Sequence, residues 1–100
     1  MDPVVVELEG EIDVQVADSV RATLLGAVRE ASGRPVVIDL SAVTSLDSSG
    51  LSSLIAAFKA SAADGGSVSL RGPSRPVLRM LEVTGMTETF GLTDSDGVGR

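Results

Sequence analysis

The sequence contains no cysteine and no histidine, and these absences exclude many kinds of functional site. Without cysteine the chain forms no disulfide bond and no thiolate zinc site, and without histidine it has no imidazole metal ligand and no serine–histidine–aspartate triad. Carboxylate-only metal sites and carboxylate acid–base pairs remain open, but the spacing of the acidic residues indicates neither. We therefore predict a protein that is not an enzyme, has no metal site and needs no cofactor.

Aromatic residues are nearly absent as well, since the chain has no tryptophan or tyrosine and only two phenylalanines, Phe58 and Phe90. Stacking surface for bases is therefore scarce. The net charge of −6 repels phosphate backbones. Direct binding to nucleic acid is disfavoured, and the core must be built from aliphatic side chains.

Long hydrophobic runs are also missing. The longest, Leu54 to Phe58, is far shorter than the roughly 20 residues that cross a bilayer. The N-terminal Met1-Asp2-Pro3 is not followed by the basic and apolar segments of a secretory signal. We expect a cytoplasmic protein that does not associate with a membrane. A chain of 100 residues, 43% of them hydrophobic, suits one compact domain.

The hydrophobic pattern of the first half predicts two strands that flank a helix. Apolar and polar residues alternate from Val4 to Glu9, which is typical of a strand, and residues 10–13 lead out of the sheet. Apolar residues recur at helical spacing from about Val16 to Ala31, which predicts a helix. Val36 to Leu40 is almost wholly apolar, as in a strand covered on both faces.

The second half continues the alternation of helices and strands. The expected elements are a helix after Asp47, a strand at Ser67–Arg71, a helix between Ser74 and Gly85, and a short edge strand at 86–92. This order predicts an α/β fold with a mixed β-sheet and helices packed on one face. The whole chain, 1–100, is expected to form one domain with its core at about 4–92 and a flexible tail at 93–100.

The segment Asp47-Ser48-Ser49-Gly50 lies where the connection after the central strand, Ser41 to Leu46, meets the second helix. A serine at a helix start can cap the helix, act as a nucleophile or accept a modification. A nucleophile needs a base to activate it, and none is visible. As an N-cap, the serine would stabilise the helix by about 1 kcal/mol. As a phosphorylation site, it would place the phosphate beside unpaired N–H groups at the positive end of the helix dipole, which favour an anion.

Three blocks of sequence, in order, resemble one known family. They are residues 8–13 (LEGEID), residues 37–51 (VIDLSAVTSLDSSGL), and residues 81–86 (LEVTGM) with Phe90. Together they span roughly residues 4 to 95. The chain is similar to STAS domains, and within them to the single-domain bacterial anti-sigma factor antagonists, also called anti-anti-sigma factors.

The resemblance implies a switch by partner exchange. In this family the serine directly after the motif aspartate, here Ser48, is phosphorylated by an anti-sigma factor that is also a serine/threonine kinase. The unmodified antagonist binds the anti-sigma factor and frees the sigma factor for transcription. Phosphorylation abolishes that binding, and a serine phosphatase restores it. The implied partner-binding residues are Asp13, Asp47, Ser48, Ser49, Gly50 and Leu51.

Simpler interpretations of the same residues stay open. Ser48 could be only an N-cap, Asp13 a loop or cap residue, Ser49 a structural hydroxyl, and Gly50 a means of relieving crowding in the first helical turn. The alternative function is a STAS accessory or scaffold subunit of a larger assembly, such as a lipid-transport ATPase or a signalling complex, in which the fold docks constitutively and no phosphate switch operates.

Overall fold

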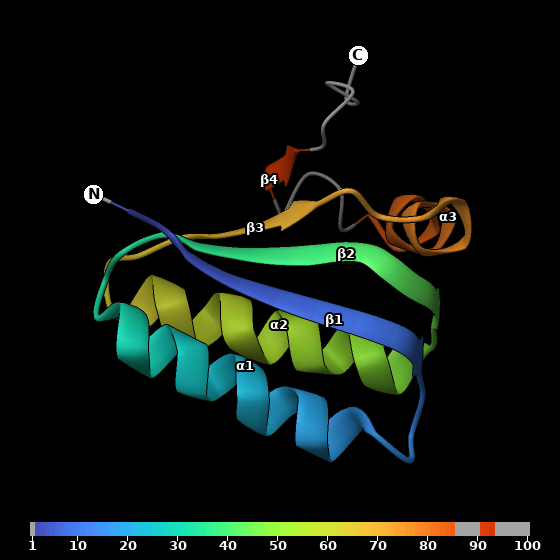
Figure 1. Ribbon diagram of the computed structural model, residues 1–100, viewed down its shortest axis with the longest axis horizontal. Helices are drawn as coiled ribbons and strands as arrows, with labels where there is room; N and C mark the ends of the chain where they lie inside the picture. The colour runs from blue at the N-terminus through green and yellow to red at the C-terminus, as the bar shows by residue number, and fades with distance from the viewer. Residues whose placement is uncertain (1, 86–90, 94–100) are drawn as a thin grey trace.

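The computed structural model describes residues 2–85 and the backbone of residues 91–93. Strands and helices alternate along the chain (Figure 1), in the order β1 (Val4–Ile12), α1 (Ala17–Ala31), β2 (Val36–Leu46), α2 (Ser48–Ala63), β3 (Val68–Arg71), α3 (Arg75–Val83) and β4 (Gly91–Thr93). The predicted α/β class is confirmed. Of the predicted last strand and tail, residues 86–90 and 94–100 lie outside the described residues.

The described strands form one sheet in the order β1-β2-β3-β4, and each neighbouring pair is parallel. The prediction of a mixed sheet is therefore wrong for this part of the chain. The physical reason is that a helix follows each of the first three strands and returns the chain to the edge from which the previous strand started.

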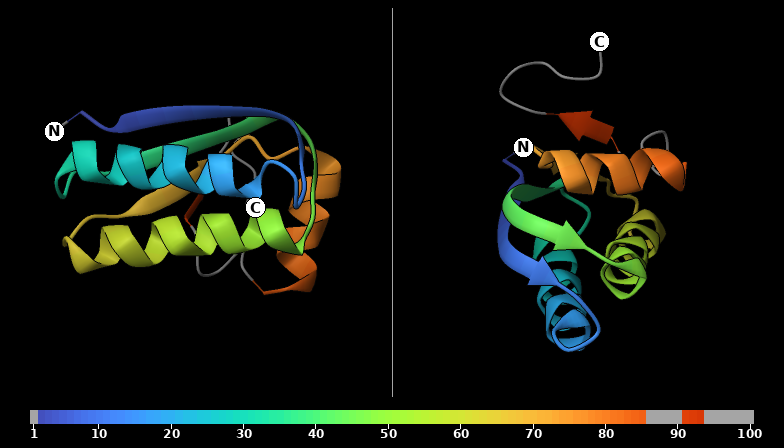
Figure 2. Two further views of the ribbon diagram at one scale, coloured as in Figure 1. Left: turned by 90° about the horizontal axis from the view of Figure 1, so that it is seen from below. Right: turned by 90° about the vertical axis from the view of Figure 1, so that its right-hand side faces the viewer.

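Two of the helices cover one face of this sheet. α1 and α2 lie side by side against it, whereas α3 lies on the other side of β2, along its last part (Figures 1 and 2). α3 buries Val77 and Leu81, and the Ser74 hydroxyl donates a 2.7 Å hydrogen bond to the carbonyl oxygen of Val43. The prediction of helices on one face thus describes α1 and α2, while α3 is held against β2.

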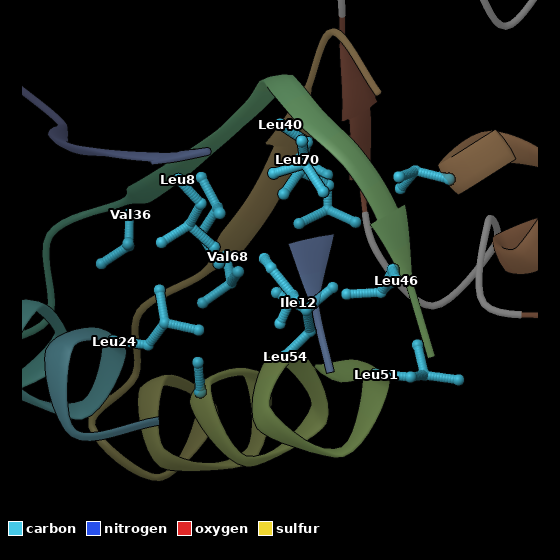
Figure 3. Close-up of a cluster of buried hydrophobic side chains, with 14 of the residues drawn as sticks. Leu8, Ile12, Leu24, Val36, Leu40, Leu46, Leu51, Leu54, Val68 and Leu70 are labelled. Atoms are coloured by element: carbon cyan, nitrogen blue, oxygen red, sulfur yellow. The ribbon is translucent and has the colours of Figure 1, made fainter. Parts of the chain in front are cut away.

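Aliphatic side chains fill the space between the sheet and the two helices, as predicted (Figure 3). Fully buried members come from α1 (Leu24), β2 (Ile38 and Leu40), α2 (Leu54) and β3 (Leu70). Each such side chain contributes about 1.5–3 kcal/mol to folding. The core therefore holds together the sheet and the two helices, and so fixes the position of the Asp47-Ser48-Ser49-Gly50 segment between β2 and α2.

β1 and β2 are longer than the sequence indicated, and this brings their ends together. β2 continues through Ser41 to Leu46, which had been expected to form a connection, and β1 continues to Ile12. The pairing between them shifts register twice, once beside Gly10, whose φ is +76°. Such irregularities break the period-two pattern of the strand. After Leu40, the next buried residues of β2 are therefore Val43 and Leu46, three positions apart instead of two.

Candidate functional site

The candidate site lies where β1 and β2 end beside each other. Ile12 pairs with Leu46 across the two strands, and the Asp47 N–H donates a 3.1 Å hydrogen bond to the Ile12 carbonyl oxygen. Asp13 and Asp47 directly follow this pair. Two predicted site residues that are 34 positions apart in sequence are thus brought to the same edge of the sheet.

Asp47, and not Ser48, is the N-cap of α2. Its Oδ1 accepts a 3.0 Å hydrogen bond from the Gly50 N–H, which satisfies one of the first-turn donors. The interpretation of Ser48 as the cap is therefore wrong. Ser48 is the first helical residue, its side chain is exposed, and in the part of the chain that the structure describes its hydroxyl has no hydrogen-bond partner.

Gly50 is buried against both strand ends. A methyl group built on its Cα would lie 2.5 Å from Leu46 Cδ1, 2.8 Å from Ile12 Cγ2 and 3.0 Å from the Ile12 carbonyl oxygen. Leu51 is only 8% exposed. These two predicted site residues lie in the interior, so they determine how closely α2 approaches the strands and do not offer side chains to a partner.

The buried Ser53 connects α2 to α1, and Ser49 lies one turn before it on α2. The Ser53 hydroxyl lies 3.0 Å from the carbonyl oxygen of Ala17 and 3.3 Å from that of Ser49, and donates to them. Ser49 itself is half-buried. Ser53 was not predicted as a site residue, because a serine on the buried face of a helix gives no signal until the partner helix is known.

The loop between β1 and α1 is ordered by Asp13. Its Oδ1 accepts a 3.0 Å hydrogen bond from the Gln15 N–H, and its carbonyl oxygen accepts one of 3.1 Å from the Val16 N–H. The turn presents two apolar side chains to solvent, since Val14 is 72% and Val16 38% exposed. These valines were also missed, because hydrophobic residues beside a predicted helix are normally assigned to the core.

An ion pair lies on β2 and β3, where Asp39 Oδ2 is 3.1 Å from Arg71 Nη2. Asp39 Oδ1 accepts hydrogen bonds from the Ser41 hydroxyl at 2.7 Å and the Ser41 N–H at 2.9 Å. The hydrogen bonds from the Ser41 hydroxyl and then the Ser41 N–H lower the pKa of the Asp39 carboxyl most; burial opposes them by raising it, and Arg71 lowers it further with smaller effects. This cluster stabilises the sheet and is not part of the segment around Ser48.

Two kinds of feature are absent from the described residues. No three acidic side chains are grouped so that they could hold a metal ion, and no helix has the length and apolar character needed to span a bilayer.

Comparison with known protein families gives a match over most of the chain. The family model described as "Mlab, STAS domain" matches residues 1–94. An anti-sigma-B factor antagonist of Bacillus subtilis is 31% identical over 88 residues, which cover 88% of this chain and 79% of that protein. An anti-sigma F factor antagonist of Paenibacillus polymyxa is 27% identical over 92 residues, 92% of this chain and 79% of that protein.

Solved structures share the fold. An anti-sigma factor antagonist from Mycobacterium paratuberculosis matches with a TM-score of 0.78 and 31% identity, covering 89% of this chain and 74% of that one. The Bacillus cell fate determinant SpoIIAA in its phosphorylated form matches with a TM-score of 0.71 and 22% identity, over 93% and 82% of the two chains. A sulfate transporter family protein from Wolinella succinogenes matches with a TM-score of 0.78 and 21% identity, over 95% and 80%.

Proposed function

Because the chain belongs to the STAS domain family, we propose that it is an anti-sigma factor antagonist whose partner binding is switched off by phosphorylation of Ser48. The observation that carries this proposal is the Ser48 hydroxyl, which is exposed and free of hydrogen bonds within the described residues. Asp47 takes the capping role, so modification of Ser48 removes no interaction that holds the helix.

The reaction at Ser48 is a phosphoryl transfer carried out by the partner kinase. A bond forms between Ser48 Oγ and the γ-phosphorus of ATP, the bond from that phosphorus to the β–γ bridging oxygen breaks, and ADP leaves. The hydroxyl proton passes to a base on the kinase. The antagonist contributes only an accessible acceptor, consistent with a sequence without histidine or cysteine.

Charge explains how one phosphate prevents binding. Phosphorylation adds about −1.5 to −2 charges directly after Asp47 and beside the strand end that carries Asp13. The N-terminus of α2 stabilises an anion by only about 0.3–1 kcal/mol. A loss of about 2.7 kcal/mol in an interface weakens binding roughly a hundredfold, so exclusion of the added charge from a desolvated contact is sufficient.

Phosphorylation and binding assays with serine variants test the proposal. An anti-sigma factor kinase from the source organism, with ATP, is expected to phosphorylate the wild type and Ser49→Ala but not Ser48→Ala. Ser48→Ala is expected to keep binding the kinase, and Ser48→Asp to bind more weakly. Stoichiometric labelling of Ser48→Ala would refute Ser48 as the acceptor. A phosphatase that restores binding would complete the cycle.

A second candidate function is constitutive docking in a larger assembly, as an accessory or scaffold subunit. The observation that favours it is the structural similarity to a sulfate transporter family protein, because the same fold there belongs to a protein of another class. In that case Ser48→Ala and Ser48→Asp would bind the partner with equal affinity, which separates this candidate from the switch.

A further inference from the structure

A groove separates the first turns of α1 and α2. It has a volume of about 270 Å³ and is lined from the β1–α1 loop by Val14, from α1 by Ala17, Asp18 and Arg21, and from α2 by Ser49, Ser52 and Ser53. The first turns of the two helices lie at the same end of the molecule (Figure 2). Ser49 lines the groove and directly follows Ser48, so the groove is continuous with the candidate site.

The size and composition of this groove favour a protein side chain over a small-molecule ligand. Pockets for drug-sized ligands and cofactors enclose about 300–1,000 Å³ and are mostly apolar. This groove is smaller and is lined by hydroxyls, one carboxylate and one guanidinium. Its volume suits one or two inserted side chains of a docked protein.

Arg21 is available to such a partner. Its side chain is exposed and, among residues 2–85, has no hydrogen bond or ion pair. Asp18 lies three residues before it on the same helix and also lines the groove, yet the two do not form a salt bridge. The positive ends of two helix dipoles border the groove, so an anionic group near Arg21 would meet these helix ends and the guanidinium as well as the carboxylate of Asp18.

Val14 supplies an apolar contact at the rim. It lines the groove and is 72% exposed, and the Asp13 hydrogen bonds to the following loop hold it in place. Arginine is enriched at protein interfaces and among the residues that contribute most to binding, and Val14 adds apolar surface beside it.

We propose that this groove receives an acidic side chain of the anti-sigma factor kinase, with Arg21 as its ionic contact and Val14 as its apolar contact. The inference rests on the proposed function and deepens it. The docking surface then has two parts: the strand ends with Ser48, where a phosphate acts, and the α1–α2 groove, which selects the partner by charge. Arginine suits this role because its guanidinium binds a carboxylate through two parallel hydrogen bonds.

The test measures the affinity of groove variants for a purified anti-sigma factor kinase that labels the wild-type chain at Ser48. All variants are made in the Ser48→Ala background, so no phosphate forms during titration. Arg21→Gln and Val14→Ser are each expected to weaken binding about tenfold or more. Arg29→Gln, which changes an exposed arginine near the other end of α1, is the matched control and is expected to bind like the parent.

The sign of the charge provides an independent readout. Asp18→Asn is expected to bind as tightly as the parent or more tightly, and the affinity of Arg21→Gln is expected to fall less with added salt than that of the parent. A partner variant that exchanges the contacting carboxylate for arginine should restore binding to Arg21→Glu.

Failure of this inference is distinguishable from failure of the proposed function. If no anti-sigma factor kinase labels the wild type at Ser48, the proposed function fails and this inference fails with it. If labelling occurs but folded Arg21→Gln and Val14→Ser bind within twofold of the parent, only the groove assignment is refuted. Weaker binding of Asp18→Asn would refute the acidic nature of the occupant.

Discussion

At the scale of single residues, each of the four residues in segment 47–50 has a different structural environment. Asp47 caps α2, Ser48 is exposed, Ser49 faces the groove, and Gly50 fills the space against the strands. The sequence identified this segment and the value of a small residue at Gly50. It could not assign the cap, because an aspartate and a serine at adjacent positions are equally good N-caps and only the backbone geometry chooses between them.

Replacing Gly50 by alanine is expected to lower the free energy of unfolding by about 1–3 kcal/mol, because the new methyl group overlaps Leu46 and Ile12. Gly26→Ala is the matched control: it lies in α1 with no atom within 4 Å of the added methyl group. That change should stabilise the protein by about 0.5–1 kcal/mol. Urea unfolding measures both, and an equal shift in the two variants would contradict the packing argument.

Asp47→Ala is expected to reduce stability by about 1 kcal/mol, whereas Asp47→Asn should stay within a few tenths of the wild type, because asparagine caps equally well. Thermal unfolding provides the comparison. The asparagine variant also separates the cap from the negative charge. If Asp47→Ala were as stable as the wild type, the hydrogen bond from Asp47 to Gly50 would have no role in holding α2.

At the scale of elements, the first helix and the third strand were predicted more accurately than the first two strands. The bounds expected for the first helix agree with α1 within one residue, since its caps and apolar spacing are local. β1 and β2 extend well beyond the segments that were predicted for them. The register shifts, and the left-handed backbone conformation of Gly10, change which residues face the core. The hydrogen bond from Ser53 to α1 and the groove lined by Val14 depend on how the two helices pack. Neither can be predicted from the sequence of one element alone.

Ser53→Ala is expected to destabilise the protein by about 1 kcal/mol, because it removes the hydroxyl that joins α2 to the Ala17 carbonyl of α1. Ser52→Ala changes an exposed neighbour on the same helix and is expected to shift stability by less than about 0.5 kcal/mol. Chemical denaturation of the two variants in parallel gives the measurement. Equal effects would show that the α1–α2 hydrogen bond is dispensable.

At the scale of the whole molecule, the sequence predicted the α/β class and the place of segment 47–50 between a strand and a helix, but not the directions of the described strands. Parallel strands joined by helices place their carboxyl ends at one edge, which is why Asp13 and Asp47 meet there. The prediction of a mixed sheet was wrong for the described strands, because the helix between each consecutive pair of them favours parallel pairing. The ion pair of Asp39 and Arg71 links β2 to β3 and makes the stability of the sheet depend on pH.

Because the pKa of Asp39 is lowered in the folded state, its contribution to stability is complete above the ordinary pKa, near 4, and disappears as the pH falls through the folded value. The difference in unfolding free energy between the wild type and Asp39→Asn should therefore shrink from pH 7 towards pH 2. Ser41→Ala should move the Asp39 pKa towards its ordinary value more than Arg71→Gln, since Ser41 is the larger cause. NMR titration measures this, and the opposite order would contradict it.

The close packing of Gly50 against Ile12 and Leu46 also limits how this molecule can transmit a signal. The first turn of α2 has no room to move towards the strands, so a phosphate on Ser48, as proposed above, would change the surface of the domain without shifting the helix. Amide hydrogen exchange along α2 and β2 should consequently be almost the same in the free modified and unmodified forms. A biosensor built on this domain would therefore have to measure whether the partner is bound. The shape of the free domain would not differ between its phosphorylated and unphosphorylated forms.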